Sequence, residues 1–117
     1  MTKQERDERI KKEFTKLKRL LTDIPKDKAN SVESLLRNAA FMSITLDDLQ
    51  DKINEIGVVS EYQNGQNQWG TKKSPEVEVY NAMIKNYMGV IKQLTDLIPN
   101  DKPIEKDELM GFVKQAK

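Results

Sequence analysis

The sequence predicts a mainly α-helical protein: a three-helix bundle with a long antiparallel helical hairpin, tipped by a small β-hairpin, and a short C-terminal helix. Apolar residues recur at alternating spacings of three and four in three segments, proline or glycine follows each segment, and the stretch between Gly57 and Pro75 breaks the pattern. The length of 117 residues indicates one domain. We expect helices at about 4–24, 29–56, 74–98 and 104–115, and a β-hairpin at about 58–72.

The first helix has one apolar stripe at a period near 3.5 residues, formed by Ile10, Phe14, Leu17, Leu21 and Ile24. Pro25 is expected to end this helix, because a proline disfavours helical geometry in the residue before it.

The second stripe is the longest and comprises Val32, Leu35, Ala39, Met42, Leu46, Leu49, Ile53 and Ile56. It predicts one helix that stops at Gly57, a residue type that tolerates the backbone geometry of a helix end. A break near Thr45 is an alternative, since Thr45 with Asp48 would also form a helix cap.

The third stripe comprises Val77, Tyr80, Ile84, Tyr87, Ile91, Leu94 and Ile98. Ser74 is predicted to cap this helix and Pro75 to occupy its first position, where a missing backbone N–H is harmless. Two long helices with a compact connection favour an antiparallel hairpin, and additional apolar residues leave room for a third helix.

The connection contains Asn64-Gly65, which favours a two-residue β-turn because both residue types tolerate positive φ. A turn there aligns Tyr62 with Asn67, Ser60 with Trp69, and Val58 with Thr71. Val58, Tyr62 and Trp69 would then share one face of the ribbon and pack on the helix ends.

Residue types argue against catalysis and against a membrane protein. The chain has no His and no Cys, so the commonest general base, zinc ligands and thiol nucleophile are missing. We expect no enzyme activity, no cofactor and no metal, and interpret Asp47, Asp51 and Glu55 as a solvated face. No apolar run approaches the roughly 20 residues that span a bilayer. A cytoplasmic protein is therefore expected.

Charge is distributed unevenly along the chain. Residues 1–28 contain ten Lys or Arg against six Asp or Glu, whereas residues 29–62 contain two against six. In the first helix Arg9, Lys12, Lys16 and Arg19 form a stripe roughly opposite the apolar one. Two interpretations remain open: contact with a nucleic-acid backbone, or an ordinary solvated helix face.

The segment YQNGQNQWGTKKSPEVE, followed by a helix and then LTDLIP, resembles small-terminase-like proteins of phages and prophages of Gram-positive bacteria. The resemblance covers about Gly57 to Pro99. It implies a non-catalytic subunit of a genome-packaging machine that forms homo-oligomers, binds duplex DNA and presents it to a large terminase subunit carrying the ATPase and nuclease.

The alternative is a helical adaptor of prophage origin that binds another protein and never contacts DNA. For the DNA-binding hypothesis the candidate residues are those with cationic or amide side chains on the hairpin and the first helix: Lys72, Lys73, Gln63, Asn64, Gln66, Asn67, Gln68, Arg9, Lys12, Lys16 and Arg19.

Overall fold

The protein is mainly helical, as predicted. A computed structural model describes residues 2–21, 24–63, 69–98 and 103–115, with side chains for all of these except 60–63, 69–72, 103–104 and 112–115. The elements in chain order are α1 (Lys3–Lys18), a 3₁₀ turn η1 (Lys26–Lys28), α2 (Ala29–Ile56), β1 (Val59–Gln63), β2 (Trp69–Lys73), α3 (Pro75–Asp96) and α4 (Pro103–Gln115).

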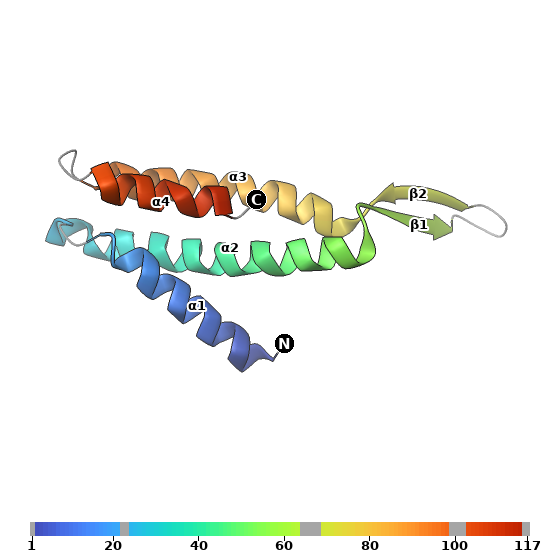
Figure 1. The fold of residues 1–117 in the computed structure, drawn as a ribbon, viewed down its shortest axis with the longest axis horizontal. Helices are drawn as coiled ribbons and strands as arrows, with labels where there is room; N and C mark the ends of the chain where they lie inside the picture. Colours follow the sequence, from blue (N-terminus) through green and yellow to red (C-terminus); the bar gives the residue numbers. More distant parts are fainter. Residues whose placement is uncertain (1, 22–23, 64–68, 99–102, 116–117) are drawn as a thin grey trace.

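The molecule is elongated, with extents of 63 × 29 × 23 Å. α2 and α3 run antiparallel as the two long rods, and β1 and β2 extend from the end where α2 stops and α3 starts (Figure 1). α1 packs on α2 and α4 packs on α3. Figure 1 shows α1 crossing α2 obliquely and not running alongside the two long helices.

α2 begins and ends where the sequence predicts, and it continues through Thr45. The Thr45 hydroxyl accepts a hydrogen bond from Arg6 of α1 and caps no helix. Gly57 follows α2 with φ 87° and ψ 170°, and its N–H donates to the Ile53 carbonyl at 2.8 Å. This backbone geometry is almost restricted to glycine, which explains the sharp stop.

α1 ends at Lys18, earlier than the predicted Ile24. The N–H groups of Leu20 and Leu21 donate to carbonyls three residues back, at 3.2 and 3.0 Å. The helix therefore ends in a 3₁₀-type turn. α3 likewise ends at Asp96, and Leu97 and Ile98 make the same kind of bond at 3.1 Å.

The hydrophobic core lies at one end of the hairpin. Its buried members are Leu17, Leu21, Val32, Leu36, Ala39, Ala40, Ile44, Leu46, Tyr87, Ile91, Leu94, Ile98 and Leu109. We call residues 29–46 and 87–98 the covered half, because α1 and α4 supply buried residues there. In the open half, residues 47–59 and 73–86, the only buried residue among those described is Ser74.

β1 and β2 pair antiparallel, with Val59 opposite Lys73 and Gln63 opposite Trp69. The predicted register, which aligned Ser60 with Trp69, is therefore wrong: Ser60 lies opposite Lys72. The predicted turn at Asn64-Gly65 lies outside the described residues. The observed register leaves five residues, 64–68, between the strands, whereas the predicted turn left two.

Ser74 joins the end of α2 to the start of α3. It occupies the predicted cap position of α3, but its side chain makes no capping hydrogen bond. The fully buried hydroxyl instead donates to the Gly57 carbonyl at 2.9 Å, and the Ser74 N–H donates to the Val58 carbonyl at 3.0 Å. These bonds fix the base of the strand pair against the helix ends.

Two glycine-to-alanine substitutions are expected to have opposite effects on stability. Gly57→Ala should lower the free energy of unfolding by about 2 kcal/mol, because a Cβ disfavours the positive φ. Gly89→Ala should raise it by about 0.5–1 kcal/mol, since Gly89 is an exposed residue inside α3 with open space around the new Cβ. Urea unfolding followed by circular dichroism measures both, and a neutral Gly57→Ala would contradict the assigned geometry.

Candidate nucleic-acid interface

The outer face of the C-terminal half of α1 is strongly cationic, whereas the exposed carboxylates Glu5, Asp7 and Glu8 lie in its N-terminal half. The exposed side chains of the C-terminal half include Lys11, Lys12, Lys16, Lys18 and Arg19, which we call the basic surface. The helix that carries them starts at an N-cap in which the Thr2 hydroxyl accepts from the Glu5 N–H at 3.1 Å. Lys12, Lys16 and Arg19 lie roughly opposite the apolar stripe that packs on α2. Lys11 and Lys18 instead lie at the edge of the contact between α1 and α2, with Lys18 Nζ 5.7 Å from the centre of the Phe14 ring.

Glu13 is the only carboxylate between residues 9 and 19, and it turns inward. It accepts a hydrogen bond from the Ser43 hydroxyl of α2, and its side chain is only 12% exposed. Lys16 Nζ lies 4.0 Å from its carboxylate, at the limit of an ion pair, and remains 65% exposed. No exposed carboxylate lies within residues 11–19, and the exposed carboxylates Asp7 and Glu8 border the basic surface one turn earlier on α1.

Arg9 does not belong to the basic surface, so its placement in a solvent-facing stripe is wrong. Its guanidinium donates to Asp48 of α2, with Nη1 2.8 Å from Oδ1. This hydrogen bond raises the pKa of Arg9 above its ordinary value. Arg6 approaches the same carboxylate at 3.8 Å and lies over the Phe41 ring at 5.1 Å. Both arginines thus hold α1 against α2.

A cluster of polar side chains beneath α1 links three helices. Ser43 of α2 lies between Glu13 of α1 and Tyr87 of α3. Burial raises the pKa of Tyr87 to about 12, an effect that Ser43 partly offsets. Among the described atoms the Tyr87 hydroxyl finds no hydrogen bond of ordinary geometry. Burial also raises the pKa of Asp47, with a further contribution from the Glu13 carboxylate.

The basic surface is slightly hollowed. Lys11, Lys12, Thr15 and Lys16 line an open depression on α1. Next to it lies a cavity of about 430 Å³ between α1 and α2, with Ile10 and Phe14 as its apolar part. Glu33 and Arg37 at its edge form an ion pair at 2.7 Å. The depression is shallow, and three of the four residues that line it are lysines.

The remaining candidates lie elsewhere. Lys73 is exposed at the end of β2, and the backbones of Lys72 and Gln63 belong to the strand pair. Asn64, Gln66, Asn67 and Gln68 lie outside the described residues. The strands extend from one end of the hairpin, whereas the C-terminal end of α1 packs near the start of α2 at the other end (Figure 1). The chain does not bring the two groups of cations together.

Sequence reasoning omitted Lys11 and Lys18 from the candidate set. They lie seven residues apart, on either side of Thr15, and therefore belong to the same helix face. A helical projection of residues 9–19 would have found them. It would not have shown that Arg9 and Glu13 turn toward α2.

Within the described ranges, no group of three or more Asp or Glu side chains is arranged to hold a metal ion. Of the helices in that part of the chain, none has the length and apolar character needed to cross a bilayer. No protein-family model, curated protein or solved structure matches this chain.

Proposed function

We propose that this protein is a non-catalytic, small-terminase-like subunit that binds duplex DNA through α1 and acts by binding. The observation that supports this most directly is the basic surface, on which five cations are exposed while Glu13 is turned away. A row of cations without interleaved carboxylates attracts a phosphate backbone, because binding releases the counterions condensed on the nucleic acid.

The other parts of the proposal follow from the sequence resemblance. β1 and β2 form the stem of the predicted β-hairpin, and Lys72 and Lys73 make a second contact with DNA. The amide residues Gln63, Asn64, Gln66, Asn67 and Gln68 contact either DNA or a large packaging subunit. Several copies assemble, so that basic surfaces from neighbouring copies face the same duplex.

The test is duplex DNA binding measured by fluorescence anisotropy across a range of salt concentrations. Lys12→Glu with Lys16→Glu should weaken binding at least tenfold and make the slope of log K against log salt shallower by about 2. Lys85→Glu with Lys92→Glu is the matched control, because these exposed lysines of α3 change the net charge equally.

The proposal fails if the protein does not bind duplex DNA at low salt, or if the α1 and α3 variants lose affinity equally. Lys72→Glu with Lys73→Glu tests the strand contact separately. An unchanged affinity there would restrict DNA contact to α1. Light scattering or sedimentation measures the mass in solution, and a monomer at all concentrations would remove the assembly from the proposal.

A second candidate function is protein binding without DNA contact. It is favoured by large apolar side chains that are exposed around the open half of the hairpin: Ile56, Val58, Val59 and Val79. An adaptor of this kind would leave duplex DNA unbound at low salt and would show no response to the lysine substitutions.

A further inference from the structure

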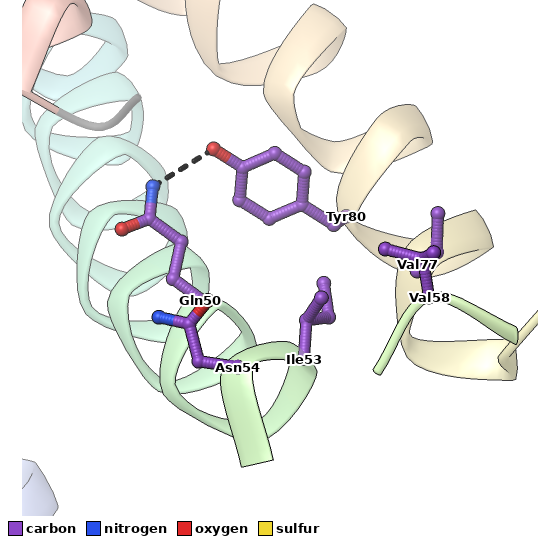
Figure 2. A pocket seen from close by; sticks show the side chains of 6 residues that line it. All are labelled: Gln50, Ile53, Asn54, Val58, Val77 and Tyr80. Carbon is purple, nitrogen blue, oxygen red and sulfur yellow. Dashed lines mark hydrogen bonds between the residues drawn. The ribbon is translucent and has the colours of Figure 1, made fainter. Parts of the chain in front are cut away.

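The open half of the hairpin contains a cavity of about 340 Å³ between the end of α2 and the start of α3. Its lining residues are Gln50, Ile53, Asn54, Val58, Val77 and Tyr80 (Figure 2). Gln50 Nε2 donates to the Tyr80 hydroxyl at 3.0 Å across the space between the helices. This bond gives the Gln50 amide nitrogen and the Tyr80 hydroxyl a partner. The apolar part of the lining is formed by Ile53, Val58 and Val77, and the exposed Asn54 adds an amide.

The cavity exists because two helices cannot bury their apolar stripes alone. In the covered half, α1 and α4 complete the core, whereas α1 reaches the open half through Arg6 and Arg9 on Asp48, and the only buried residue described there is Ser74. Val58, which lines the cavity, is 59% exposed, so its apolar side chain is accessible to a partner. Ile56 and Val79 are also exposed in the open half, by 40% and 48%.

The edge of α2 shows what kind of helix fits. α1 is an amphipathic helix whose arginines pair with Asp48, and Arg6 is the first of its residues to do so. Asp51 and Glu55 follow Asp48 at spacings of three and four, so they continue the same edge of α2. Both are exposed. The surface used by α1 thus continues beyond Asp48 with the same combination of apolar residues and carboxylates.

We propose that the open half binds an amphipathic helix of a partner protein that has a row of aliphatic residues and arginine or lysine along one edge. An aliphatic side chain of that helix enters the cavity, and its cations pair with Asp51 and Glu55. The arrangement repeats the α1 interface one step further along α2, in the manner of helix-in-groove recognition. A second copy placed face to face fits less well, because it would bring two identical acidic edges together.

This inference does not depend on DNA binding, and its test uses no DNA. The probe is a synthetic helical peptide with leucines at alternating spacings of three and four and arginines along one edge. A control peptide has glutamates in place of the arginines. Binding to the full chain is followed by amide chemical shifts, which report which residues respond to the peptide.

The arginine peptide should shift the amides of Gln50, Ile53, Asn54, Val77 and Tyr80 and leave the covered half unchanged. Asp51→Lys with Glu55→Lys should weaken the arginine peptide at least tenfold and strengthen the glutamate peptide. Asp96→Lys with Glu108→Lys, at exposed positions on α3 and α4, should change neither affinity by more than about twofold.

Three results would overturn the inference. The first is no saturable shift with the arginine peptide, and the second is an equal response to both peptides. The third is a concentration-dependent shift at the cavity without any peptide, which would assign the surface to a second copy of the chain.

Discussion

Replacing Ile91 with alanine is expected to lower the free energy of unfolding by about 3 kcal/mol. Ile91 is fully buried in the covered half, so the substitution removes apolar contacts and leaves a cavity. The same substitution at Ile53, which is only half-buried in the open half, should cost about 1 kcal/mol or less. Urea unfolding followed by circular dichroism at 222 nm gives both values.

This pair of substitutions tests the one-ended core directly, because the removed atoms are identical and only the surroundings differ. Similar urea dependences of the two variants would show that the unfolded states are comparable. If Ile53→Ala were as costly as Ile91→Ala, the open half would be packed as tightly as the covered half. The proposed docking surface would then lose its physical basis.

The second large effect is a loss of stability in alkali that depends on Tyr87. Its folded pKa is about 12, raised by burial from the ordinary value of 10.0. Above pH 10 the unfolded chain loses this proton while the folded chain keeps it, so ionisation favours unfolding. The contribution is fully present below pH 10 and declines as the pH rises to about 12. Its total is about 3 kcal/mol.

Tyr87→Phe isolates this effect, because the lysines and the other two tyrosines titrate in both proteins. The difference in unfolding free energy between wild type and variant should change by about 2 kcal/mol between pH 9 and pH 12, because the folded tyrosine is half ionised at pH 12. Absorbance of tyrosinate near 295 nm should show one tyrosine in the folded protein that ionises late. A difference that stays constant with pH would contradict the burial assigned to Tyr87.

The helices follow closely from sequence pattern. The stripe from Val32 to Ile56 is long and regular, and a glycine with positive φ ends it, so both ends of α2 could be predicted. The ends of α1 and α3 could not, because i to i−3 hydrogen bonds close both helices before the proline. The strand register also failed, since a turn motif indicates where a chain can reverse but not how many residues the connection contains.

The candidate site was only partly accessible from sequence. Lys12, Lys16 and Arg19 are exposed on α1 as expected, but Arg9 pairs with Asp48 and Glu13 contacts Ser43. Which charges face solvent depends on the direction in which α1 crosses α2, and an apolar stripe does not encode that direction. The cavity of the open half could not be predicted either, because the residues that line it form no recognisable pattern in the sequence.

Local patterns therefore specify the helices of this protein, because helix formation depends on the spacing of apolar residues and on the residue types at the ends. Tertiary packing decides the rest. α1 and α4 cover one end of the hairpin, and that placement leaves five cations of α1 in solvent and the far end of the hairpin unburied. The physical reason is that exposure is a property of the assembled helices, since each side chain is shielded by residues distant in the chain.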